Sequence, residues 1–216
     1  ELDRLSSVIE SVSGAFDEET SNTSIFLAIP AFELRYSSVK FPQIKFLAQH
    51  IDDAPVGSTT GFLVPEIAKA SGARGSLVNH SEHRLDKETI ENIVSRLRNL
   101  GMISVVCAKD DAEVATFAKF GPDFIAIEPP ELIGSGIAVS KVRPEIISNS
   151  QGALERSKPT GSKTKLLCGA GIVDETDARH AIELGAEGIL VASGVVKARI
   201  WNEKIEELLR GISGVK

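Results

Sequence analysis

Short apolar runs of strand length recur along the chain, and most of the later ones are followed by a segment with helical periodicity. Seven such runs are SIFLAIP, IKFLAQ, GSLVNH, ISVVCAK, FIAIE, KLLCGAG and GILVAS. Runs that are apolar on both faces predict strands of a parallel sheet covered by helices. The helical patterns stop at glycines, which favour the position just beyond a helix, namely Gly101, Gly121, Gly185 and Gly211. The repeat predicts an α/β fold, either a doubly wound sheet or a (β/α)8 barrel.

The length of the chain favours the barrel. In 216 residues, seven strand and helix units come close to the eight units that occupy about 250 residues in a (β/α)8 barrel. No linker or break in composition divides the sequence, so we predict one barrel domain over residues 1–216. The opening stretch LDRLSSVIESVSGAF has apolar residues at helical spacing, which predicts a chain that starts on an amphipathic helix. Residues 146–164 predict a helix followed by a loose loop.

Charge and apolar content exclude two classes of partner. The 24 basic and 30 acidic side chains give a net charge of −6, the wrong sign for a protein that binds nucleic acid through phosphate contacts. The apolar runs fall short of the roughly 20 residues of a membrane-spanning helix, so we predict no membrane contact. Cys107 and Cys168 each lie inside an apolar run and, like the four histidines, lack metal-ligand spacing. We therefore expect buried thiols, no metal, no cofactor and a cytoplasmic protein.

Chemically useful side chains follow several of the apolar runs, at the strand ends where function collects in parallel sheets and barrels. His80 stands in NHSEHR after one run, and Glu128 opens EPPELIGSG after another. In the second motif, two prolines and a Gly-x-Gly flank an apolar tip, which is typical of a closing lid. The small residues of GAG and ASG, after the last two runs, let backbone N–H groups face an anion. Each motif alone is weak evidence for a functional site, but all of them project to the same open end of the predicted barrel, its mouth.

Together these groups suit proton transfer next to the carbonyl of a small phosphorylated substrate. The carboxylate would abstract the carbon proton, and a neutral imidazole would polarise the carbonyl. The lid would exclude water, so that the enediolate does not eliminate its phosphate.

At NHSEHR, IEPPELIGSG, CGAG and LVASG the sequence closely resembles triosephosphate isomerases of the compact archaeal type, and the resemblance covers essentially the whole chain. It implies interconversion of D-glyceraldehyde 3-phosphate and dihydroxyacetone phosphate through an enediolate. Glu128 would be the general base and His80 the electrophile, two roles that are established for the family.

The resemblance also assigns supporting residues. Five of them would meet the substrate phosphate, in the lid tip and in the turns after strands seven and eight: Ile133, Gly134, Gly171, Ala192 and Ser193. Glu82 matches an acid two residues beyond the histidine and would support the site. The long loop around Thr60 and Gly61 matches the family's intersubunit loop, which implies a homodimer or a homotetramer.

The sequence departs from the family pattern in three places. The family begins with a strand ending in Asn-x-Lys, whose lysine neutralises the substrate phosphate, whereas this chain starts on a helix. We therefore expect a barrel without its first strand, whose two exposed edges would be the SIFLAIP and GILVAS strands. Phe62 replaces the polar residue usual after the Thr-Gly of the intersubunit loop, and His83 stands where Arg or Asn is commoner.

Two other functions stay open on the sequence. The first is a catalytically impaired barrel with an interaction or regulatory role, in which loss of one charge contact lowers activity roughly a hundredfold or more. The intact His80 and Glu128 argue against it. The second is another phosphate-binding barrel enzyme, of the indole-glycerol-phosphate or ribulose-phosphate type, which accounts for GAG and ASG but not for NHSEHR.

Overall fold

The structure, a computed structural model, describes residues 1–15, 23–129 and 144–214 as alternating strands and helices. The strands are β1 (Phe26–Ile29), β2 (Lys45–Ala48), β3 (Gly75–Val78), β4 (Ile103–Ala108), β5 (Phe124–Ile127) and β6 (Lys165–Cys168). The helices are α1 (Leu2–Ala15), η1 (Ala31–Glu33), α3 (Leu34–Lys40), α4 (Pro65–Ala70), α5 (Lys87–Asn99), α6 (Asp111–Ala118), α8 (Pro144–Ser157), α9 (Glu175–Glu183), α10 (Ser193–Val196) and α11 (Trp201–Ser213).

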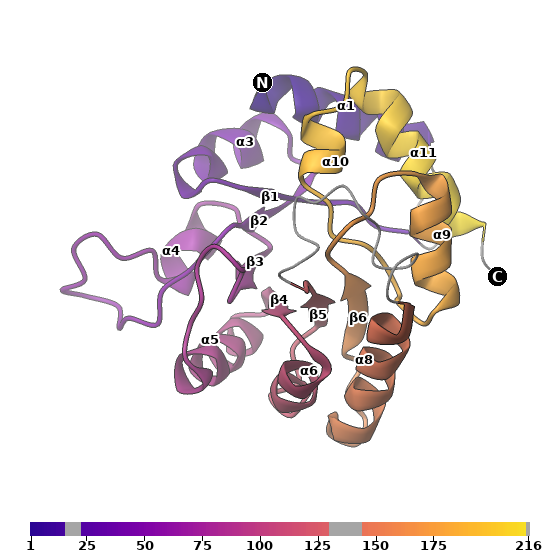
Figure 1. The fold of residues 1–216 in the computed structure, drawn as a ribbon. Helices are drawn as coiled ribbons and strands as arrows, with labels where there is room; N and C mark the ends of the chain where they lie inside the picture. The colour runs from indigo at the N-terminus through magenta and orange to yellow at the C-terminus, as the bar shows by residue number, and fades with distance from the viewer. Residues whose placement is uncertain (16–22, 130–143, 215–216) are drawn as a thin grey trace.

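The six strands form one parallel sheet in the order β1-β2-β3-β4-β5-β6, so each strand lies beside the strands that precede and follow it in the chain. The sheet curls strongly (Figure 1). Phe26 of β1 and Phe124 of β5 meet edge to face with ring centroids 6.4 Å apart, although three strands separate them in the sheet order. The predicted α/β barrel class is thereby confirmed as a curled parallel sheet with helices outside it.

The two faces of the sheet bury different sets of side chains. The concave face holds a small cluster, formed chiefly by Leu47, Leu77, Val105, Cys107 and Ala126. A much larger cluster fills the space between the convex face and the helices. Burial on both faces explains why the strands read as continuous apolar runs rather than as alternating ones.

Most of the predicted helix boundaries hold. Helices α5, α6 and α9 begin after Asp86, Asp110 and Asp174, whose side chains each accept a hydrogen bond from a backbone N–H of the first turn. They end before the three glycines expected to stop them. The predicted stop at Gly211 is wrong, because α11 continues to Ser213 with this glycine buried inside it.

The last apolar run, GILVAS, differs from its prediction as a strand. Backbone hydrogen bonds tie residues 187–190 to β6, including Leu190 N–H to the Cys168 carbonyl at 2.9 Å. Only one isolated parallel bridge forms, between Cys168 and Ile189. Among the described residues β6 is the one strand that pairs with this segment, and β6 itself ends at Cys168, so the pairing has no room to extend.

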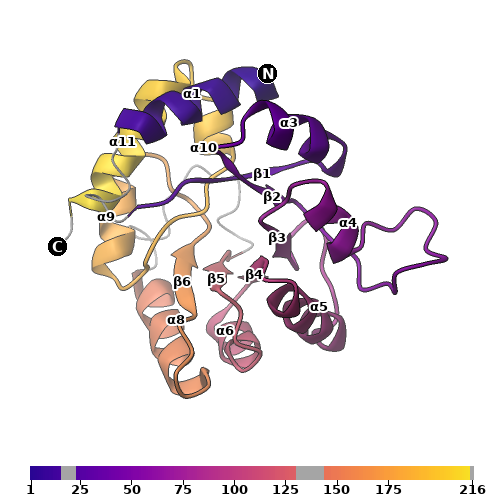
Figure 2. The same cartoon turned by 180° about the vertical axis from the view of Figure 1, so that it is seen from behind.

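Helices α1 and α11, the first and last of the described helices, lie side by side, as Figures 1 and 2 show from opposite directions. Trp201, which opens α11, donates its indole N–H to the Val196 carbonyl at 3.2 Å. The guanidinium carbon of Arg4 in α1 lies 5.1 Å from the centre of the same ring. In the part of the chain that the structure describes, no helix is long and apolar enough to cross a membrane.

Candidate active site

His80 and Glu128 come together at the carboxyl ends of two strands. His80 follows β3 by two residues, and Glu128 directly follows β5. Strand β4 lies between these strands in the sheet, and the curl of the sheet brings the two side chains together. His80 Nε2 lies 3.8 Å from Glu128 Oε1. The pairing expected from the sequence is therefore present in the fold.

The turn after β3 fixes which nitrogen of His80 can donate. The backbone N–H of Glu82 donates to Nδ1 at 3.3 Å. In the neutral ring, Nδ1 is then the acceptor and Nε2 carries the hydrogen, on the side that faces Glu128. The carboxylate of Glu82 lies 3.7 Å from the same Nδ1 and is largely exposed, so it borders the ring from solvent. His80 thus presents a hydrogen-bond donor to the mouth.

Glu128 is a carboxyl group in an apolar environment. Its side chain is 5% exposed, and burial raises its pKa above the usual value. His80, the Cys107 thiol, Arg84 and the backbone N–H of Ser81 lower the pKa, but by less than burial raises it. Among the described residues, no group donates a hydrogen bond to its Oε2. A buried carboxylate with a raised pKa and an unoccupied oxygen is well suited to accept a proton from a bound molecule.

The turn after β6 leaves room for this carboxyl group. A Cβ on Gly169 would lie 2.6 Å from Cγ of Glu128, closer than real side chains approach. Gly171 has a φ of 71°, in the left-handed region that glycine adopts readily. The chain near Ser193 lies alongside, since a Cβ on Gly194 would be 3.0 Å from the Ile172 carbonyl. The GAG and ASG turns are therefore neighbours, and the GAG turn borders Glu128.

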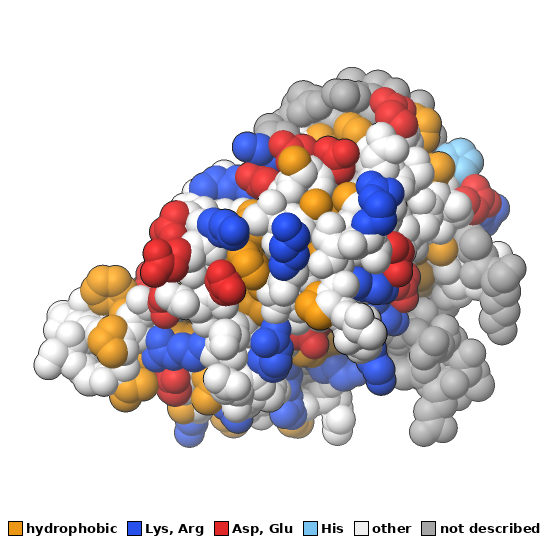
Figure 3. Space-filling view, turned by 90° about the horizontal axis from the view of Figure 1, so that it is seen from below, with side chains coloured by type: hydrophobic (Ala, Val, Ile, Leu, Met, Phe, Trp, Pro, Cys, Tyr) orange, Lys and Arg blue, Asp and Glu red, His pale blue; other side chains and the backbone are white. Residues whose placement is uncertain are grey.

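Of the other sequence-predicted residues, two belong to the ASG turn, two to the lid motif and one to the long loop. Ala192 and Ser193 are exposed, Ser193 opening the short helix α10. Ile133 and Gly134 lie outside the described residues. Thr60 lies in an exposed turn of the long loop between β2 and α4, which projects from the body in Figure 1 and forms the left end of the surface in Figure 3, where hydrophobic side chains gather.

Three residues that support the site were missed by sequence reasoning. Buried Asn79, with a φ of 62°, donates from Nδ2 to the Cys107 carbonyl at 2.8 Å and accepts the Leu85 N–H at 2.9 Å. Arg84 donates to the Asn79 carbonyl at 3.2 Å and pairs with Glu113 at 3.4 Å. The Cys107 thiol contacts Glu128 from the concave face, and its pKa is raised by burial first and by this carboxylate second. One signal was available, since Asn tolerates left-handed backbone at a strand end.

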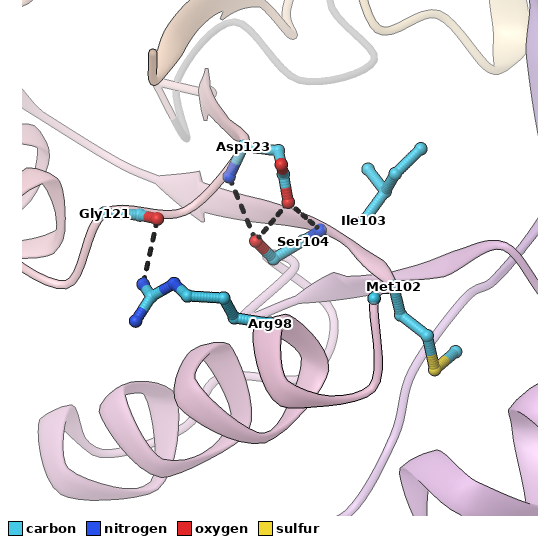
Figure 4. Close-up of a pocket in the computed structure, with 7 residues that line it drawn as sticks. Arg98, Met102, Ile103, Ser104, Gly121 and Asp123 are labelled. Carbon is cyan, nitrogen blue, oxygen red and sulfur yellow. Dashed lines mark hydrogen bonds between the residues drawn. The ribbon is translucent and has the colours of Figure 1, made fainter. Parts of the chain in front are cut away.

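The opposite end of the sheet carries a cavity of about 260 Å³, between the start of β4 and the segment before β5. Its polar side chains are paired with one another (Figure 4). Ser104 and Asp123 exchange hydrogen bonds at 2.9 to 3.0 Å, and Arg98 donates to the Gly121 carbonyl at 3.0 Å. These contacts tie β4 to β5, so the candidate catalytic residues are those at the opposite end of the sheet, where His80 and Glu128 lie. Within the described ranges, no cluster of three or more metal-ligating side chains occurs.

Comparison with known proteins points to one family throughout. The family model described as triosephosphate isomerase matches residues 1–208. A triosephosphate isomerase from Cenarchaeum symbiosum is 48% identical over 205 residues, which are 95% of this chain and 90% of that protein. Those from Archaeoglobus fulgidus and Methanocaldococcus jannaschii are 45% and 42% identical, over 95% and 90% of this chain and 88% and 87% of their own lengths.

Proposed function

The chain belongs to the triosephosphate isomerase family, and we propose that it interconverts D-glyceraldehyde 3-phosphate and dihydroxyacetone phosphate with Glu128 as general base and His80 as electrophile. One observation carries the assignment of roles. A buried carboxylate with an unoccupied oxygen lies 3.8 Å from an imidazole nitrogen that, in the neutral ring, carries a hydrogen.

The reaction follows from this geometry. The Glu128 carboxylate takes the proton from the carbon next to the substrate carbonyl, and burial makes it a stronger base than an exposed carboxylate. The Nε2–H of His80 donates to the carbonyl oxygen as negative charge develops there, which stabilises the enediolate. Glu128 then returns the proton to the neighbouring carbon. His80 Nε2 passes its proton to the former carbonyl oxygen and takes up the proton of the neighbouring hydroxyl, whose oxygen becomes the new carbonyl. Both protons are conserved, so the reaction consumes no cofactor or metal.

We place the substrate phosphate on the same side of the mouth. We assign it to the backbone N–H groups around Gly171 and at Ala192 and Ser193, because these two turns are neighbours and the first one borders Glu128. Ile133 and Gly134 of the EPPELIGSG segment complete this assignment as the lid tip. Glu82 would support His80 through its backbone N–H rather than its exposed carboxylate.

The test is the isomerisation of glyceraldehyde 3-phosphate by the wild-type chain and by Glu128→Gln. General-base catalysis contributes about 10²–10⁴-fold, so we expect the substitution to lower kcat by at least about 10²-fold while the circular dichroism spectrum is unchanged. Ser148→Ala, at an exposed position of α8, is the matched control and should retain wild-type kcat. A folded wild-type chain without isomerase activity would contradict the proposal and favour an interaction role.

We also propose one barrel domain over residues 1–216, acting as a homodimer or homotetramer in the cytoplasm. One cluster of buried side chains runs from Leu5 to Leu209, and Cys107 and Cys168 are free thiols. The loop bearing Thr60 carries apolar side chains that are more than half exposed, Val56 at 68% and Phe62 at 52%. Sedimentation of wild type and Phe62→Ser tests the assembly, and we expect the substitution to shift the protein toward the monomer.

A further inference from the structure

Two histidines that the proposed reaction does not use lie face to face beside the site. His50 follows β2 by two residues, and His83 lies in the turn that follows β3. Their rings are stacked, with centroids 3.7 Å apart and planes at 12°. Strands β2 and β3 are neighbours in the sheet, so the stack joins two adjacent loops at their carboxyl ends.

His50 belongs to the neck of the long loop after β2. Its Nε2 lies 3.3 Å from Asp52 Oδ1. Asp52 closes the neck in two ways, because its backbone N–H donates to the Leu63 carbonyl at 2.8 Å and its Oδ2 accepts the Leu63 N–H at 2.8 Å. Arg96 of α5 donates to the Ala54 carbonyl at 2.6 Å and secures the same neck from the helix side. Hydrogen bonds therefore hold in place the segment of backbone that carries His50.

His83 belongs to the tight turn that carries His80. Its backbone N–H donates to the His80 carbonyl at 2.8 Å, in the turn that also brings the Glu82 N–H to the His80 ring. Asn79 and Arg84 hold the two ends of this turn. The middle of the turn is held from the side by the imidazole stack.

We propose that His50 and His83 are positioning residues, whose stacked rings press the turn after β3 against the neck of the long loop and thereby hold the His80 ring at its distance from Glu128. The role deepens the proposed isomerase function and rests on it. The contact reaches the reaction only through the orientation of His80, since neither ring is the partner of Glu128.

The stack is sensitive to acid. Burial lowers the pKa of His50, Asp52 opposes this effect, and neighbouring His83 lowers the pKa further. Asp52 from the loop neck and His83 from the turn after β3 are the charged or titratable groups that face it among the described residues. A lowered pKa means that His50 binds a proton less tightly in the stack than after it has left the stack. The stack is therefore stable at neutral pH and weakens as the pH falls below the ordinary value of 6.5.

The substitution His83→Ala removes the stack while leaving an exposed position. We expect kcat at pH 7.5 to fall about 10-fold with KM within twofold, since misplacement of a reacting group by 1 Å can cost up to about 10²-fold. His83→Phe restores a planar ring that does not titrate, and should recover most of kcat and reduce its fall between pH 7 and pH 5.5. His180→Ala on α9 is the matched control and should behave as wild type.

Titration of the histidine ring protons by NMR gives a readout that does not depend on activity, because the chain has four histidines. We expect His50 to titrate below 6.5 in the wild type and to move upward in His83→Ala. Unchanged kcat, pH profile and His50 titration in His83→Ala would overturn the positioning role. A wild type that lacks isomerase activity would overturn the proposed function instead, while the titration still reports whether the rings are stacked.

Discussion

At the scale of single residues, the burial of Glu128 favours catalysis but disfavours the folded state. The carboxyl group is almost fully buried, and one of its oxygens has no donor among the described residues. Burial without a full set of partners disfavours the charged form, and the same imbalance makes the carboxylate a better base. The reactivity of this side chain and its cost to the folded state therefore have one physical cause.

The substitution Glu128→Gln is therefore expected to stabilise the protein at neutral pH. The raised pKa of Glu128 means that the folded state holds its proton more tightly than the unfolded chain does, so stability falls as the pH rises through the folded pKa. The neutral amide avoids this loss. We expect thermal unfolding at pH 7 to shift upward by about 2–4 °C, the change that ~1 kcal/mol gives in a chain of this size. The gain should vanish at pH 4, and a lower Tm at pH 7 would contradict the argument.

Gly169 offers a second test at this scale. The substitution Gly169→Ala places a methyl group 2.6 Å from Cγ of Glu128, so the carboxylate has to move. We expect kcat to fall at least about 10-fold, in line with the sensitivity of catalysis to 1 Å displacements, while the protein stays folded. Gly14→Ala is the matched control, because a Cβ there meets nothing within 4 Å. Equal kcat values for the two variants would contradict the close approach.

His80 and Glu128 could be predicted from the sequence because the carboxyl ends of parallel strands converge. Their supports could not be predicted in the same way. Asn79 contributes through a left-handed backbone angle that the sequence leaves open. Cys107 lies in a run that is apolar on both faces, and such a run does not reveal which residues face the concave side. The His50 and His83 stack depends on the register between two loops.

At the scale of elements, Gly211 of α11 shows that a glycine can either end a helix or let a helix pack closely against its neighbour. The sequence IEELLRG predicts a helix that stops at Gly211, since glycine favours the position beyond a helix. The glycine instead lies inside α11, where the absence of a side chain lets this helix approach α9. Glycine as a stop and glycine as a contact surface look alike in a sequence, and only the neighbouring helix distinguishes them.

The substitution Gly211→Ala is therefore expected to destabilise the protein. A Cβ at this position would lie 2.8 Å from Cβ of Ala178 and would also meet the Glu175 carbonyl. The clash should outweigh the gain of about 0.5–1 kcal/mol that alanine brings to a helix, because backbone cannot rotate away, and overpacking costs about 1–3 kcal/mol. Urea unfolding measures the net loss. The control Gly14→Ala, also in a helix but without a neighbour, should be neutral or stabilising.

At the scale of the whole molecule, the strands of the sheet differ in the number of neighbouring strands with which they pair. Strand β5 is paired on both sides, by β4 and β6, whereas β1 pairs with β2 alone among the described residues. An unpaired edge leaves backbone groups to solvent. The strand order could be predicted from the βα repeat, whereas the short pairing of GILVAS could not, because it depends on where β6 ends.

Hydrogen exchange should reveal this inequality. Strands β1 and β5 are both four residues long, so they form a matched pair within one molecule. We expect amides of residues 26–29 to exchange faster than those of residues 124–127, because opening an edge strand breaks one ladder instead of two. Exchange followed by mass spectrometry measures both segments together. Equal protection of the two strands would show that another part of the protein covers β1.

The contact between α1 and α11 has a consequence for how the chain is made. Each strand pairs with the strand made just before it, so the sheet can grow in step with synthesis. Helix α1 is the exception, because α11, against which it packs, follows every other described helix in the chain. The apolar face of α1 therefore stays uncovered by α11 until the strands and helices between them have been made.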